Sequence, residues 1–192
     1  GLTPAAQHAI FFTSFTAMRS MLDEIDKQGV PVLGLLATRS EDTMTFDKYG
    51  DQLCLPLGAL GKLLGPAVID SMAFTGSDSY LLTGSDLAVL FEAKDAKVLT
   101  QAFKLLHAKA KFTGTGVREV KGNVAGVSYT GVINLDRTVC AYFAVIGRSV
   151  IVSNSLVQLE KIVRTAQGKN PSLAKLDEYT FFRDRYKISG KG

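Results

Sequence analysis

Residue types that perform acid–base and nucleophilic chemistry are scarce in this chain of 192 residues. Histidine occurs twice, at His8 and His107, and tryptophan is absent. We expect His8 in a strand and His107 on a helix, partly exposed because it follows the apolar Leu106. One general base is sufficient for an enzyme, so a hydrolase could pair either histidine with a serine. Neither histidine lies in a motif that indicates such a pair, and the sequence assigns no catalytic residue.

A single serine has a lysine three residues later, Ser172 with Lys175. This spacing can place an amine beside a hydroxyl on one helical turn. The Lys-Thr-Gly and Ser-Asp-Asn partners of such enzymes are missing, although Lys111-Phe-Thr-Gly114 resembles the first, and there is no Gly-x-Ser-x-Gly motif. We therefore interpret Ser172–Lys175 as a turn or helix start.

The tetrapeptide Thr-Gly-Ser-Asp occurs twice, at 75–78 and 83–86. Its residues are typical of turns, and we expect two turns that flank one short strand. The alternative is a paired loop that offers carboxylates and hydroxyls to a cation or a sugar. An acidic cluster at Asp23, Glu24 and Asp26 lacks the alternating ligands and central glycine of a calcium loop.

Other motifs argue against a bound metal or nucleotide. Two histidines and two distant cysteines do not make a zinc site, which needs three or four ligands. Gly114-Thr-Gly116 precedes a strand, whereas a phosphate-binding loop precedes a helix. Glycines at 58, 61 and 65 favour close packing of a short helix over ligand binding. We expect no metal and no cofactor.

Cys54 and Cys140 are the only cysteines, and each lies in an apolar, strand-like context. We expect both to be buried free thiols, because cysteine behaves as a small apolar residue. A disulfide between them is the alternative if the protein is exported.

Hydrophobic periodicity predicts alternating strands and amphipathic helices. Strands are expected at 8–13, 66–75, 80–82, 86–93, 127–135, 138–146 and 149–153. Helices are expected at 15–28, 96–110, 156–167 and 177–187, with a short one around 57–64. Asp95 and Ser155 directly precede two of these helices, in the position favoured for N-caps.

These elements predict an α+β fold of antiparallel β-meanders with amphipathic helices packed on one face. Residues 66–110 and 118–167 share a β-β-β-α pattern, which indicates an internal duplication; the alternative is that any amphipathic helix after strands gives this match. We expect one domain over residues 1–188, followed by a linker or disordered tail at 189–192, within a fragment of a longer protein.

Composition and charge limit the classes of protein and of function that are compatible with this sequence. Hydrophobic residues make up 46% and charged residues 21%, which excludes a disordered tail. No apolar run is long enough for a membrane span. Residues 1–90 hold 5 Lys and Arg against 10 Asp and Glu, whereas residues 91–192 hold 17 against 8. The halves thus carry −5 and +9, and we expect them to complement each other; binding of an anionic polymer through the basic half is the alternative.

Several short motifs carry a resemblance that spans most of the chain. They are His8-Ala-Ile-Phe-Phe, Asp51-Gln-Leu-Cys-Leu-Pro56, Leu64-Gly-Pro-Ala-Val68, Thr75-Gly-Ser-Asp78, Ala88-Val-Leu-Phe-Glu92, Val152-Ser-Asn-Ser155, Pro171-Ser-Leu-Ala174 and Phe181-Phe-Arg-Asp-Arg-Tyr186. In these motifs the chain is similar to large uncharacterised bacterial proteins of planctomycete type. The resemblance implies a domain of a long exported protein, in the cell envelope or secreted, and gives no catalytic residue.

The expected function is therefore a non-catalytic structural module, or one that binds a ligand or a protein, within a larger bacterial protein. Other domains of that protein are the expected partners, and nucleic acid is not. The alternatives are a hydrolase with an isolated Ser/His pair and a binder of anionic polymer through the basic half.

Overall fold

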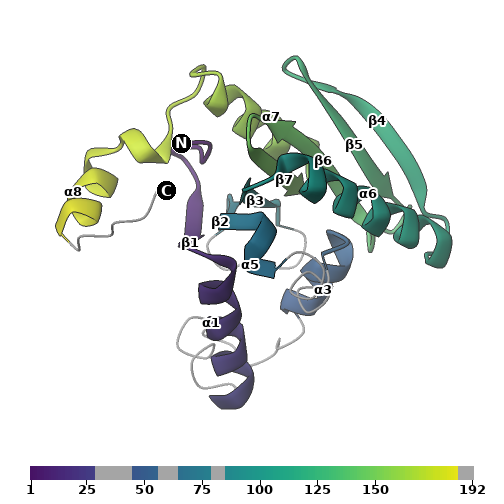
Figure 1. Cartoon of the computed structure of the whole chain (residues 1–192). Helices are drawn as coiled ribbons and strands as arrows, with labels where there is room; N and C mark the ends of the chain where they lie inside the picture. The colour runs from purple at the N-terminus through teal and green to yellow at the C-terminus, as the bar shows by residue number, and fades with distance from the viewer. Residues whose placement is uncertain (29–44, 56–64, 79–84, 186–192) are drawn as a thin grey trace.

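The computed structural model describes residues 1–28, 45–55, 65–78 and 85–185, and these residues are built on one antiparallel sheet (Figure 1). Seven strands follow the order β1-β2-β3-β7-β6-β5-β4. They are β1 (His8–Phe12), β2 (Ile69–Gly76), β3 (Leu87–Ala93), β4 (Arg118–Val124), β5 (Val127–Ile133), β6 (Cys140–Ile146) and β7 (Ser149–Ser153). The helices are α1 (Phe15–Gln28), α3 (Thr45–Gln52), α5 (Gly65–Val68), α6 (Ala96–Thr113), α7 (Leu156–Ala166), the 3₁₀ turn η1 (Leu173–Lys175) and α8 (Asp177–Arg185).

The most apolar strands lie in the middle of the sheet. β3, β7 and β6 are buried along most of their length, because both of their faces are covered. The edge strand β4 is mostly exposed and reads Arg-Glu-Val-Lys-Gly-Asn-Val, a composition that discourages further strand pairing. The composition of the strands therefore distinguishes the central strands from this edge strand.

Helix α6 covers one face of the sheet together with α1 and α3. Asp95 caps its first turn by accepting hydrogen bonds from the backbone N–H groups of Lys97 and Val98, at 2.8 and 3.2 Å. Its buried side chains pack on the face of the sheet that holds Phe91 and Phe143. The buried residues of α6 are Leu99, Phe103, Leu106 and His107.

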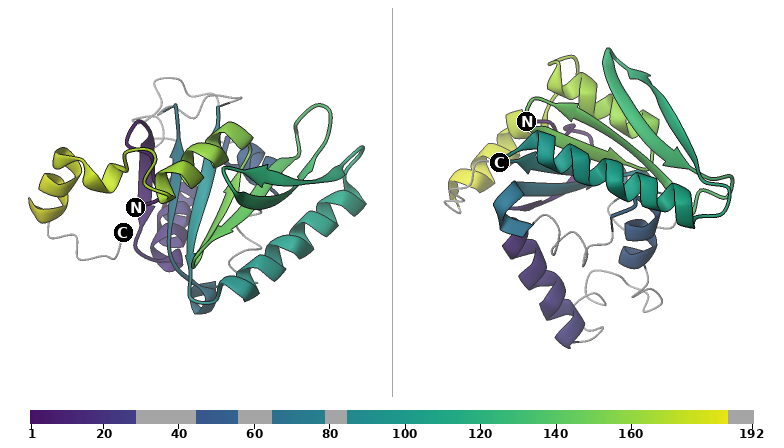
Figure 2. Two further views of the ribbon diagram at one scale, coloured as in Figure 1. Left: turned by 90° about the horizontal axis from the view of Figure 1, so that it is seen from above. Right: turned by 45° about the vertical axis from the view of Figure 1, so that its right-hand side comes forward.

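Helix α7 covers the opposite face (Figure 2). Its first turn is capped by Ser155, whose hydroxyl accepts from the backbone N–H of Gln158. Leu159 and Ile162 pack on a second core that includes Leu90 and Ile151, the strand neighbours of residues in the first core. The predicted α+β class and its antiparallel meanders are confirmed. The expected packing of all helices on one face is corrected, because alternating side chains of the central strands are apolar in both directions.

The two predicted repeat units place their helices on opposite faces of the sheet. β3 and β7 are antiparallel neighbours, so a twofold rotation normal to the sheet would exchange them and leave each face unchanged. Such a rotation would place α6 and α7 on one face, whereas they pack on two. The second unit also has four strands, against two among the described residues of the first. These differences count against a superposable duplication.

Most predicted elements coincide with observed ones, with shifted ends. The strand predicted at 66–75 begins at Ile69, because residues 65–68 form the helical turn α5. Helix α3 was not predicted. The strand predicted at 80–82 and most of the helix predicted around 57–64 lie outside the described residues.

Two further expectations concern the thiols and the membrane. Cys54 and Cys140 are both buried and free, as predicted. Burial raises the pKa of Cys54 to about 12 and also raises the pKa of Cys140. No helix among the described residues has the length and apolar character needed to cross a bilayer.

Candidate functional site

A cleft of about 460 Å³ opens on the α7 face of the sheet, on the β1–β2–β3 side. Helix α7 packs against β3, β7, β6 and β4, so it leaves this part of the face uncovered. The volume lies in the range of small-molecule sites, which is roughly 300–1,000 Å³. The cleft is therefore the candidate functional site.

The register of the strands divides the cleft floor into two rows. Ser71 pairs with Glu92, and Glu92 pairs with Ser149, which gives a polar row across β2, β3 and β7. Two residues away along the strands, Ala73 pairs with Leu90, which gives an adjacent apolar row. Side chains two residues apart point to the same face, so both rows face the cleft.

A charged network closes the polar end of the cleft. The Arg148 guanidinium lies 3.4 Å from a Glu92 carboxylate oxygen and 3.5 Å from one of Asp70. The Ser149 hydroxyl donates to Glu92 at 2.6 Å, and Arg148 also donates to the backbone carbonyl of Ala93 at 3.2 Å. Two carboxylates thus face one guanidinium, a formal charge of −1.

A β-bulge positions Asp70, and a tight turn positions Arg148. The pairing of β2 with β3 shifts between Ile69 and Ser71, so Asp70 lies at a bulge, a feature that re-aims side chains. Arg148 follows Gly147, whose φ of 58° lies in the left-handed region that a tight turn between β6 and β7 requires. A bulge and a turn therefore bring the two ends of the network together.

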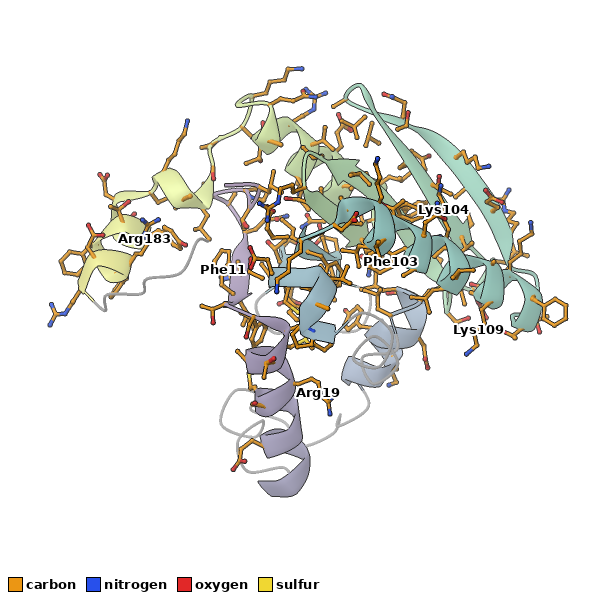
Figure 3. All side chains as sticks on the ribbon, viewed as in Figure 1. Phe11, Arg19, Phe103, Lys104, Lys109 and Arg183 are labelled. Atoms are coloured by element: carbon orange, nitrogen blue, oxygen red, sulfur yellow. The ribbon has the colours of Figure 1, made fainter. Side chains whose placement is uncertain are left out.

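The remaining walls come from both ends of the described chain. The segment before β1 pairs with the residue before η1 through a bridge between Pro4 and Ser172. The lining includes Leu2 and Thr3 of the first segment and Leu173 and Ala174 of η1. Helix α8 contributes Tyr179, whose ring lies 5.9 Å from that of Phe11, and Arg183 (Figure 3). No residue of α8 or of η1 is buried, so these walls pack less firmly than the strands of the floor.

A buried amide cluster anchors the N-terminal wall to α7. Gln158 donates to the side-chain oxygen of Gln7 at 2.8 Å, and the Gln7 amide donates back to Gln158. The Thr75 hydroxyl donates to the same Gln7 oxygen at 3.1 Å. All three residues are buried, so these bonds satisfy amides that would otherwise be unpaired.

The structure does not bring the sequence-based catalytic candidates together. His107 is buried on the inner face of α6, at 5% exposure, which corrects the expectation that it is partly exposed. Neither of its ring nitrogens has a hydrogen-bond partner among the described residues. Its ring lies edge-on to Phe143, and desolvation lowers its pKa to about 4. His8 lies exposed on β1. This arrangement lends no support to a Ser/His hydrolase.

Two other motifs serve local structure. Ser172 caps η1, where its hydroxyl accepts from the backbone N–H of Ala174 at 3.3 Å. The described parts of the two Thr-Gly-Ser-Asp segments contact each other, because Ser77 donates to Asp86 and Ser85 donates to Asp78. The described residues contain no cluster of three potential metal ligands.

Sequence reasoning missed the residues of the cleft. Glu92 gives a weak signal, since it is the one charged residue of the apolar strand Leu87–Ala93. Asp70, Arg148 and Ser149 give none, because a bulge, a turn and strand register bring them beside Glu92 from distant parts of the chain.

The chain was compared with protein-family models, with curated proteins and with solved structures. No family model matches it. No curated protein and no solved structure matches it either.

Proposed function

We propose that this domain is a binding module for a small amphipathic molecule, held in the cleft of the α7 face. One observation carries the proposal: a polar row and an apolar row lie side by side in an open cleft of ligand size. Ligand sites combine apolar surface with a few convergent polar groups in this way. In keeping with the resemblance, we propose that the module belongs to a larger exported bacterial protein.

The two carboxylates at the polar end of the cleft favour an amine at that end of the ligand, whereas Arg183 lies on the α8 wall. Asp70 and Glu92 present two carboxylates to a single guanidinium at 3.4–3.5 Å, so their oxygens keep the capacity to accept further hydrogen bonds. An ammonium group there would make charge-assisted hydrogen bonds. The apolar body of the ligand would lie along Leu90 and Ala73, with Tyr179 beside it.

Two probes with one ring system and opposite charge test this proposal. We expect tryptamine to shift the amide resonances of Ser71, Glu92 and Ser149 in NMR titrations, and 3-indolepropionate to bind more weakly. Glu92→Gln keeps the side-chain volume and removes the charge, so it should weaken tryptamine binding at least about 5-fold.

Glu160→Gln is the matched control, because Glu160 lies on α7 and pairs with Arg164 outside the cleft lining. Equal binding of both probes, equal weakening by the two variants, or no shift at about millimolar tryptamine would overturn the proposal.

A further inference from the structure

The outer face of α6 carries apolar side chains at a strict seven-residue spacing. Val98, Leu105 and Phe112 are exposed by 48%, 71% and 92%, although the opposite face of the same helix is buried in the core. Residues seven apart lie nearly above one another on a helix, so the three form one column. Nothing within the described residues covers this column.

A second column, of lysines, runs beside the first. Lys97, Lys104 and Lys111 each directly precede a residue of the apolar column, and all three are exposed. Lys109 adds a fourth charge, and α6 contains no acidic residue (Figure 3). Two acids lie close to the helix: Asp95 caps its first turn, and Glu119 of β4 pairs with Lys111 at 3.8 Å and with Lys121 at 2.8 Å.

The two columns match the heptad positions of a coiled coil. With Val98, Leu105 and Phe112 at position a, the lysine column occupies every g position and Lys109 an e position. Gln101 and Ala108 then occupy the d positions, and both are exposed. In coiled coils the a and d residues pack on the partner helix, and charges at e and g select the partner.

We infer that the outer face of α6 docks an acidic amphipathic helix of another protein, with apolar residues on its seam and glutamates beside it. The lysine column excludes a second copy of α6, since like charges would then face each other. An anionic membrane fits less well, because interfacial helices present a broad apolar face rather than one column. Nucleic acid would leave the apolar column without a partner.

A designed peptide tests this inference. The probe is a labelled peptide of three heptads with leucine at a and d and glutamate at e and g, and its control has lysine at e and g. Fluorescence anisotropy should show binding of the glutamate peptide alone. The affinity should fall as NaCl rises from about 0.05 M to about 0.5 M, because salt screens exposed charges.

Substitutions in each column separate the apolar contribution to peptide binding from the contribution of charge. Leu105→Ser should weaken binding at least about 10-fold, the loss expected for one buried leucine contact. Lys104→Glu should weaken it about 5-fold and should leave the unfolding midpoint unchanged. Val157→Ser is the matched control, because Val157 is 63% exposed on α7 and should not affect binding.

Three results would overturn the inference: no binding of the glutamate peptide, equal weakening by Leu105→Ser and Val157→Ser, or equal binding of both peptides. Binding of phosphatidylglycerol vesicles or duplex DNA without binding of the glutamate peptide would also overturn it. The test involves no residue of the cleft, so its outcome is separate from that of the proposed ligand binding.

Discussion

The two faces of the sheet are covered by different kinds of buried side chain. On the α6 face the interior is aromatic: the ring of Phe103 lies 5.4 Å from that of Phe91 and 6.2 Å from that of Phe143. On the α7 face, buried amides and hydroxyls lie between α7 and the sheet, with Gln158 at their centre. Among the described residues, α1, α3 and α6 all pack on the α6 face, whereas α7 leaves part of its own face open.

This difference indicates that the α6 face contributes mainly to stability and the α7 face mainly to binding. An apolar interior contributes most of the stability, because burial of apolar surface is the largest favourable contribution to folding. The α7 face is open on the β1–β2–β3 side, so it can hold a ligand there without disturbing the aromatic core. Changes on the α6 face should therefore affect stability first, and changes on the α7 face should affect binding first.

The largest effect is expected from Phe103→Ala on the α6 face. Phe103 is fully buried between two other rings, so its removal should lower the free energy of unfolding by about 3–5 kcal/mol. Leu105→Ala on the exposed side of the same helix should change it by about 0.5 kcal/mol or less. Urea unfolding measures both, and similar losses would show that the α6 core is not the main source of stability.

Acid should weaken the same face through His107. Desolvation lowers the pKa of His107 from 6.5 to about 4 in the folded state, so the unfolded chain binds more protons between these values. Above about pH 6.5 the ring is neutral in both the folded and the unfolded state, and the free energy of unfolding is highest. As the pH falls toward 4, the free energy of unfolding decreases by roughly 3 kcal/mol. His107→Leu should flatten the pH dependence in this window. A variant as sensitive to acid as the native chain would contradict the assignment.

A smaller effect is expected from Gln158→Leu on the α7 face. The substitution leaves the buried Gln7 NH₂ group without its acceptor, although the Gln7 oxygen keeps its bond from Thr75, so we expect a loss of about 1–3 kcal/mol in urea unfolding. Gln7→Leu combined with Gln158→Leu should lose less than the sum of the two single losses, because the pair is then removed together. Additive losses would mean that the two amides do not act as a pair.

Much of the local structure could be predicted because its signals lie within a few residues. Asp95 and Ser155 cap α6 and α7 at the expected positions, and β7 spans the predicted residues. His107 was misplaced for a physical reason. It lies four residues after Phe103 and eight after Leu99, so it continues the inner face of α6, which is wider than the apolar residues alone indicated.

The sequence by itself determined most of the strands and helices, the caps of α6 and α7 and the α+β class, because periodicity and capping are local properties of the chain. It did not predict α3 or α5, and it did not assign bounds to β4. Tertiary structure alone decided that α6 and α7 lie on opposite faces, that Glu92 meets Arg148 and Asp70, and that the column with Leu105 stays exposed. The reason is that strand register and the choice of face depend on pairing between distant segments. Central strands that are apolar on both sides accept a helix on either face.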